Sequence, residues 1–339
     1  MNDRPIDKVR NSALSMTLPA DTGGITDMGE INGALHMIGG SAIYRVQLAD
    51  EIDRGRTNIA IPNTQQKVLS YGTEFPYVRQ TLMTARRLFS NMVLGPAFDY
   101  KAGINLSFEA LQDLAAMYDI CKDVGARFDK IAEDLENLSV ERRSMTLPSM
   151  GDVRGETKAF LQKADHVAIA LFKIAKLFYG DEIGKGLFKS LHKLASEKYG
   201  DNDEFTKFLK AVLPFLQFVR NARNAVEHPD QAKSVKVTDI SLQPSGELNP
   251  PTIEVIEAKT AQPPVPLLAL MERVADQLAT VFEVMLAHLC GANVQPFGGL
   301  PLCVVEYDKD QQKAFKCRYG YAGRMGDRIV PLLPPASPP

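Results

Sequence analysis

The sequence lacks closely paired cysteines, a glycine-rich phosphate-binding loop, an excess of basic residues and a long uncharged apolar run. Its four cysteines, Cys121, Cys290, Cys303 and Cys317, form no C-x-x-C pair, so free thiols in a reducing compartment are the simplest interpretation. His288 and the last three cysteines could in principle meet around a metal, but structural zinc sites usually draw their ligands from closely spaced pairs. We therefore expect no metal and no cofactor.

Charge and hydropathy narrow the function further. The net charge is −2 at pH 7 and the isoelectric point is near 6.3, so any contact with nucleic acid has to come from a local basic patch. No 18 uncharged apolar residues run together, and the first ten residues contain charges and a proline but no apolar segment. These features predict a cytoplasmic protein that makes no membrane contact.

The N-terminal half gives the weaker structural signals. Residues 1–27 show no sustained period and predict a flexible arm. Apolar residues in the range 28–150 recur at spacings that allow helices, so we expect a helical N-terminal region, although Gly39 and Gly40 weaken this prediction near its start. Residues 139–155 contain the prolines and glycines typical of a connection, which places a domain boundary near 150.

Residues 151–330 carry the clearest pattern. Apolar residues recur at three-and-four spacing in four segments, which are 156–179, 183–199, 201–227 and 264–289. Alternating apolar residues after Pro229 and again within 302–319 predict two small β-hairpins. The expected fold is therefore mainly α, a helical bundle with a helical N-terminal extension and small β-hairpin additions. The proline-rich end, 331–339, is predicted to be disordered.

The third of these helices ends in a stretch with unusual chemistry, residues 218–230. Before Pro229 its polar side chains are Arg220, Asn221, Arg223, Asn224, Glu227 and His228. A histidine, whose ordinary pKa is about 6.5, can take a proton from a ribose 2′-hydroxyl or give one to the leaving 5′-oxygen. An arginine can hold the non-bridging phosphate oxygens and stabilise the transition state. Because RNA supplies the attacking hydroxyl, this stretch predicts metal-free RNA cleavage.

Helical geometry limits how these groups meet. On a continuous helix, Asn224 and His228 lie within about 40° of each other, whereas Arg223 lies about 140° from His228. A single straight helix would therefore not direct Arg223 and His228 at one atom. A kink, the reach of the arginine or a second copy of the helix across a two-fold axis could bring them together.

The segment Arg223-Asn224-Ala-Val-Glu-His228 resembles the signature of the HEPN superfamily (higher eukaryotes and prokaryotes nucleotide-binding domains). In that signature an arginine followed by a polar residue precedes a histidine by four to six intervening positions, and the resemblance covers roughly residues 156–290. It implies an all-helical domain that dimerises to form a shared, metal-independent endoribonuclease site. Such sites are common in toxin–antitoxin and antiviral systems, so a possible antitoxin or defence partner protein is also implied.

The resemblance assigns roles to individual residues. It implies that Arg223 and His228 are catalytic and that Asn224 positions them. Arg220 and Asn221 lie outside the family pattern, and we add them as RNA-binding residues on geometric grounds alone. Glu227 lies inside the motif without a fixed role and is assigned with them to RNA binding. The expected products are a 2′,3′-cyclic phosphate and a 5′-hydroxyl end.

A non-catalytic alternative fits the same residues. Arginines and a histidine near a helix C-terminus complement the helix dipole, and Arg223 with Glu227 could form a surface ion pair. The chain is also longer than a minimal HEPN domain and carries strand-like segments after the motif. On this interpretation the protein is a helical scaffold that binds RNA, a nucleotide or a partner protein.

Overall fold

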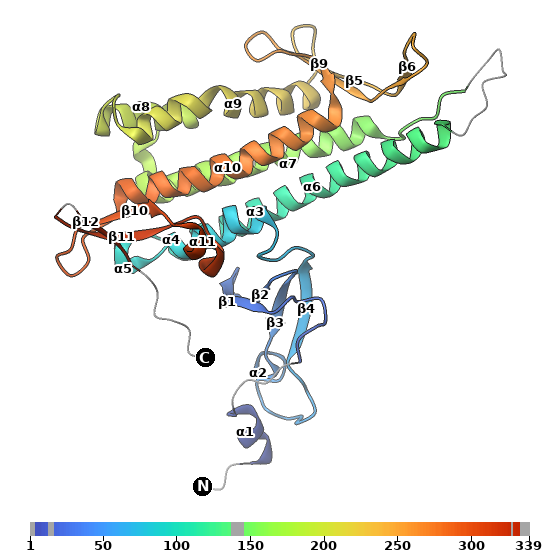
Figure 1. Cartoon of the computed structure of the whole chain (residues 1–339). Helices are drawn as coiled ribbons and strands as arrows, with labels where there is room; N and C mark the ends of the chain where they lie inside the picture. Colours follow the sequence, from blue (N-terminus) through green and yellow to red (C-terminus); the bar gives the residue numbers. More distant parts are fainter. Residues whose placement is uncertain (1–3, 13–16, 137–145, 327, 333–339) are drawn as a thin grey trace.

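The computed structural model describes residues 4–12, 17–136, 146–326 and 328–332. Within that part of the chain, long helices lie beside one another and four antiparallel sheets are attached to them (Figure 1). The fold is therefore a mixture of helices and sheets. The prediction of a mainly α fold with only small hairpin additions is wrong.

The largest difference lies in residues 28–69, where the apolar spacing favours helices but the chain forms a four-stranded sheet of order β1-β2-β3-β4. Its strands are β1 (Ile25–Ile31), β2 (Ala34–Gly39), β3 (Ile43–Gln47) and β4 (Thr64–Leu69). The inner strands β2 and β3 carry apolar residues on both faces, because Ile38 and Ile43 belong to the main core while Met37 and Tyr44 pack in a second, smaller cluster. A strand buried on both faces lacks the polar alternation that identifies strands, so its spacing resembles that of a helix.

The N-terminal segment that was expected to be a flexible arm contains regular structure. The expected arm, residues 1–27, contains helix α1 (Pro5–Arg10) and the beginning of β1, and Arg10 binds Asp50 of the short helix α2 (Ala49–Ile52) at 3.2 Å. Of the expected disordered tail, residues 333–339 lie outside the described residues.

A set of short helices connects the first sheet to the long helices. They are α3 (Pro76–Val78), the π-helical turn η1 (Arg79–Met83), α4 (Thr84–Leu88) and α5 (Asn91–Leu94). Pro76 stands in the first turn of α3, where its missing N–H costs nothing. The chain then enters α6 (Tyr100–Glu136), a single long helix that matches the helical pattern of its sequence.

The strongly periodic segments form the helices that the sequence predicts. They are α7 (Val153–Tyr179), α8 (Phe188–Tyr199), α9 (Glu204–Glu227) and α10 (Leu267–Asn293), with the 3-10 turn η2 (Gly180–Glu182) after α7. Asp203 caps α9 by accepting a hydrogen bond from the N–H of Phe205. One apolar cluster contains residues of α6, α7, α9 and α10, so the main core extends across the boundary expected near residue 150.

The remaining strands form three small sheets. One has the order β5-β8-β9 and follows α9, a second pairs β6 with β7, and the third has the order β10-β11-β12. Their bounds are β5 (Ser234–Thr238), β6 (Ser241–Leu242), β7 (Leu248–Asn249), β8 (Thr252–Ile256), β9 (Gln262–Pro266), β10 (Leu302–Glu306), β11 (Tyr319–Met325) and β12 (Arg328–Pro331), with helix α11 (Lys309–Phe315) between β10 and β11. The first predicted hairpin is confirmed by the pairing of β5 with β8. The second predicted hairpin differs from the expectation. Its strands β10 and β11 do pair, but helix α11 lies between them and begins at a capping box formed by Asp308 and Gln311.

Helix α10 is the most apolar helix of the described chain. By length and composition alone it is long enough to cross a membrane, but 67% of its most apolar window is buried inside the protein. Glu283 on this helix is only 3% exposed, and its carboxylate accepts a long hydrogen bond of 3.5 Å from the Thr84 hydroxyl. Burial raises the pKa of Glu283, although the positive charges of Arg318 and Arg79 partly offset that effect.

This buried carboxyl predicts a pH-dependent stability. Because the pKa of Glu283 is raised by folding, the stability that the protonated form provides is present below the ordinary value of 4.5 and is lost as the pH rises through the raised pKa. We expect Glu283→Gln to stabilise the protein at pH 8 by about 1–2 kcal/mol and to have little effect at acid pH. Thermal melting of both proteins from acid pH to pH 8 measures this difference in stability. The exposed Glu272→Gln on the same helix should change nothing, and a destabilised Glu283→Gln at pH 8 would contradict the prediction.

Candidate functional site

The predicted site residues lie at one end of the contact between α7 and α9, where polar side chains replace apolar ones. We call this group the α7–α9 polar cluster, and its members are Lys158, Gln162 and Asp165 on α7 and Arg220, Arg223 and Glu227 on α9. The two helices run antiparallel, because the residues that pair rise in number along α9 as they fall along α7. Both sets recur at helical spacing, which places each set on one face of its helix.

A buried carboxylate joins the two arginines. Asp165 has a side chain that is 3% exposed, and its Oδ2 atom accepts a hydrogen bond of 2.6 Å from Nη1 of Arg220. The same oxygen lies 3.7 Å from Nε of Arg223. The arginine side chains themselves remain 40% and 29% exposed. Each guanidinium is therefore anchored on the inside and open to solvent on the outside.

Glu227 occupies the outer end of the cluster. Its carboxylate accepts a hydrogen bond from the amide of Gln162 and lies 3.6 Å from Nζ of Lys158. Burial acts to raise the pKa of Glu227, but the hydrogen bond from Gln162 and the positive charges of Lys158 and Arg223 outweigh it, so the pKa lies below its usual value. Glu227 is thus ionised at neutral pH and is held by α7.

Asn224 and His228 complete the predicted motif. Nη1 of Arg223 donates a hydrogen bond of 3.2 Å to Oδ1 of Asn224. Helix α9 ends at Glu227, and His228 has non-helical dihedral angles, φ −130° and ψ 63°, with its N–H donating to the Asn224 carbonyl at 2.9 Å. The imidazole is exposed and has no hydrogen-bonding partner within the described residues. The angle expected on a continuous helix therefore does not apply to His228.

Asn221 faces a different neighbour. Its amide donates to Oγ1 of Thr260 at 3.0 Å and to Oε2 of Glu257 at 3.3 Å. These two residues lie in the connection between β8 and β9, so Asn221 ties α9 to the adjacent sheet. Arg220 and Arg223 are thus linked through Asp165, and Asn224 is bonded to Arg223. Glu227 binds α7 beside them, and His228 follows the end of the helix.

Asp165 is the residue that the sequence analysis missed. It lies on the same stripe of α7 as the buried Leu161, Ala168 and Phe172. A carboxylate among these apolar residues needs a cationic partner, because burying an unpaired charge is costly. That isolated acid is the signal that could have identified it.

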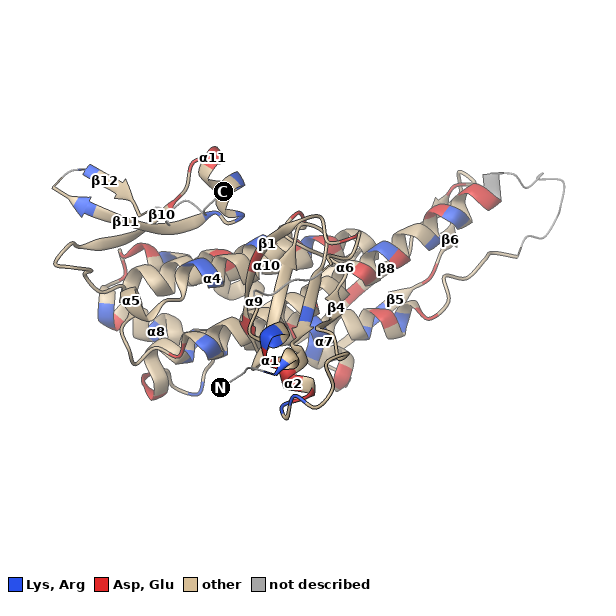
Figure 2. Ribbon diagram, turned by 90° about the horizontal axis from the view of Figure 1, so that it is seen from below, with Lys and Arg blue, Asp and Glu red and all other residues tan. Residues whose placement is uncertain are grey.

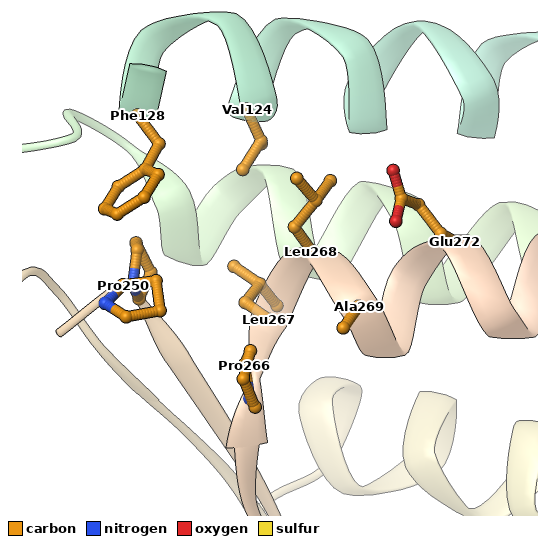
Figure 3. Close-up of a pocket in the computed structure, with 9 residues that line it drawn as sticks. Val124, Phe128, Pro250, Pro266, Leu267, Leu268, Ala269 and Glu272 are labelled. Carbon is orange, nitrogen blue, oxygen red and sulfur yellow. The ribbon is translucent and has the colours of Figure 1, made fainter. Parts of the chain in front are cut away.

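Two cavities lie elsewhere in the described chain and contain none of residues 220–230. The first, of about 240 Å³, lies between α6 and the start of α10 and is lined by Phe128, Pro250, Pro266 and Leu268, with Glu272 at its edge (Figure 3). The second, of about 330 Å³, lies in the groove between α6 and α7. Neither cavity contains the candidate site, whose two arginine side chains are partly exposed.

Charge on the helices is mixed. Positions of Lys and Arg are interspersed with positions of Asp and Glu along the ribbons of the long helices (Figure 2). A nucleic acid would have to be bound through a local group of cations, as the net charge already implies. In the α7–α9 polar cluster three cations face two carboxylates.

His288, Cys290, Cys303 and Cys317, which were considered as metal ligands, do not meet in a metal-binding group. Among the described residues no three His, Cys, Asp or Glu side chains are arranged to hold a metal ion. Cys290 and Cys317 are buried, and burial raises the pKa of Cys317 to about 12. His288 stacks on Phe205 and Phe208 of α9, with ring centroids 5.6 and 4.8 Å away.

Comparison with known proteins adds nothing to this geometry. No protein-family model matches the chain, and no curated protein or solved structure matches it either.

Proposed function

We propose that the protein is a metal-independent endoribonuclease with a HEPN-type motif, acting as a cytoplasmic homodimer. It cleaves RNA by internal transesterification and leaves a 2′,3′-cyclic phosphate and a 5′-hydroxyl end. The observation that carries this proposal is the arrangement at the end of α9. An exposed histidine follows an arginine whose guanidinium is fixed by Asp165 on one side and by Asn224 on the other.

The roles follow from the chemistry of each group. The ribose 2′-oxygen attacks the phosphorus and the bond to the 5′-oxygen breaks, while one proton leaves the 2′-hydroxyl and one reaches the 5′-oxygen. His228 serves proton transfer, because an imidazole exchanges protons near neutral pH. Arg223 binds the non-bridging oxygens and stabilises the charge that develops on them, and Asn224 positions the Arg223 guanidinium.

A second copy of the chain completes the site in this proposal. Within one chain, no contact between the side chains of Arg223 and His228 is present among the described residues. The imidazole stands at the exposed end of α9, where a two-fold axis would bring the same group from the partner. Two motifs would then supply one histidine for the 2′-hydroxyl and another for the 5′-oxygen.

One observation favours a second candidate, a non-catalytic scaffold that binds RNA, a nucleotide or a partner protein. Both arginines are paired with a buried carboxylate, and such pairs are also common where charges serve only to join two helices. This scaffold would retain binding at the cluster but would have no use for His228 as an acid or base.

A cleavage assay with EDTA present tests the proposal. Purified protein is incubated with several structured and unstructured RNAs, and the product ends are mapped. We expect cuts that persist in EDTA and carry 2′,3′-cyclic phosphates, lost in Arg223→Ala. Intact RNA in every reaction, or products with 3′-hydroxyl ends, would reject this chemistry and leave the binding scaffold.

A further inference from the structure

The two arginines of the α7–α9 polar cluster share a single counter-charge. Nη1 of Arg220 and Nε of Arg223 approach the same oxygen of Asp165, at 2.6 and 3.7 Å. Because one oxygen binds both, the two guanidinium groups are kept next to each other despite their mutual repulsion. One carboxylate neutralises one of the two charges, so the trio keeps a net positive charge at the protein surface.

Most of the hydrogen-bonding capacity of this trio is unused. A guanidinium has five N–H donors, and the contacts in the described chain are one from Arg220 to Asp165 and one from Arg223 to Asn224, beside the longer ion pair of Arg223. Both arginine side chains are partly exposed, so the remaining donors face solvent. Two adjacent forks with free donors and a net positive charge match the geometry and charge of a phosphate group.

We propose that Asp165 is a positioning residue that holds Arg220 and Arg223 as a two-guanidinium clamp for one phosphodiester of an RNA strand. This rests on the proposed function for its substrate class and deepens it by assigning a role on α7 to the same site. Asp165 touches no substrate. It fixes the direction of both forks, which lowers the conformational entropy that two free arginines would lose on binding a phosphate.

Packing alone does not account for Asp165. Leu161, Ala168 and Phe172 on the same side of α7 are apolar and buried, and an apolar residue in place of Asp165 would avoid the cost of burying a carboxylate. A simple ion pair between α7 and α9 would also need only one arginine. The second arginine, with its free donors, is explained when the pair has an anion to bind.

Whether Asp165→Asn raises or lowers the affinity for RNA shows whether Asp165 positions the arginines or only contributes negative charge. The probe is a fluorescent 2′-O-methyl oligoribonucleotide, which keeps its phosphates but cannot be cleaved. Asp165→Asn removes a negative charge from the site, so Coulomb attraction alone predicts tighter binding. If Asp165 holds the clamp, the same change weakens binding, and we expect about a tenfold loss of affinity by fluorescence anisotropy.

Asp113→Asn is the matched control. Asp113 lies on α6 and pairs with Lys163 of α7 at 3.1 Å, so its loss removes a negative charge near α7 without touching the arginine pair. The Asp113→Asn variant should bind the oligonucleotide probe with unchanged or higher affinity. Circular dichroism melts of both variants check that each is folded.

If Asp165→Asn fails to fold, variants of the two arginines test the clamp instead. A clamp on one phosphate needs both forks, so Arg220→Gln, Arg223→Gln and the double variant should lose similar affinity. Each single change should also reduce the salt dependence of binding by about one released counterion. Additive losses, or an Arg220→Gln variant that binds like wild type, would overturn the clamp.

The outcomes for binding and for cleavage are separable. Binding weakened by Asp165→Asn in a protein that cuts no RNA would keep the clamp and reject the ribonuclease. Cleavage and binding both unaffected by Asp165→Asn would keep the ribonuclease and reject the clamp. A wild-type protein that does not bind the oligonucleotide at low salt would also reject the clamp.

Discussion

His228→Ala should reduce RNA cleavage by at least about 100-fold and change the affinity for uncleavable RNA by no more than about twofold. The physical reason is that the imidazole is the one group in the motif able to exchange protons near neutral pH. Its side chain is exposed and makes no hydrogen bond within the described residues, so its loss should not lower stability. Single-turnover cleavage and anisotropy binding on the same preparations measure both quantities.

His166→Ala provides the control for this substitution. His166 is another exposed histidine, 59% exposed, and it lies on α7 opposite Asp113 at 3.7 Å. If cleavage depends on proton transfer at the end of α9, His166→Ala should cut RNA at the wild-type rate. Equal activity of wild type and His228→Ala would remove the catalytic role and favour the binding scaffold.

The long helices were predictable because a single local signal, the helical spacing of apolar residues, identifies them. In α7, α9 and α10 apolar residues recur at helical spacing over more than twenty positions, and glycine or proline marks their ends. Asp203 and Gly200 place the start of α9 almost to the residue. Where periodicity is long and one face is polar, tertiary contacts do not alter the choice of helix.

The first sheet was not predictable from the same signal. Its inner strands, β2 and β3, are short and apolar on both faces, because a second cluster around Met37, Tyr44 and Val46 covers the side away from the main core. The glycines at 39 and 40, which weakened the helical interpretation, are where the chain turns between β2 and β3. A Cβ atom at Gly39 would lie 2.2 Å from the carbonyl oxygen of Thr22, and one at Gly40 would lie 2.6 Å from that of Gly23. These contacts come from outside the β2–β3 turn, so no local pattern reveals them.

The candidate site was predictable only on one helix. Spacing within α9 identifies Arg220, Arg223 and Asn224 as neighbours, and Arg223 does contact Asn224. The partner that joins the arginines, Asp165, comes from α7, 55 residues away from Arg220. The pairing of two helices depends on packing that a single sequence does not specify. The exit of the chain from helical geometry at His228 has a local cause, because Pro229 follows it and disfavours helical dihedral angles at the preceding residue.

Gly72→Ala should destabilise the protein by about 2–3 kcal/mol. A Cβ atom at this buried position would lie 2.3 Å from the carbonyl oxygen of Gly39 and 2.4 Å from the carbonyl carbon and oxygen of Gly40. Those atoms belong to the backbone and are held in place, because the N–H groups of Thr73 and Glu74 donate to the same two carbonyls at 2.9 Å. The clash therefore has to move the junction between the sheet and the segment that leads to α3.

Thermal melting and limited proteolysis measure this effect, with Gly55→Ala as the control. Gly55 is exposed, and a Cβ there would meet only the methyl group of Thr57, at 3.3 Å, and Oδ1 of Asp53, at 4.0 Å. We expect Gly72→Ala to lower the melting temperature by about 5 °C and to expose the first sheet to protease before the long helices are cut. A Gly72→Ala protein that melts and resists protease like Gly55→Ala would show that the sheet does not pack on this junction, and the arrangement of β1 to β4 would have to be revised.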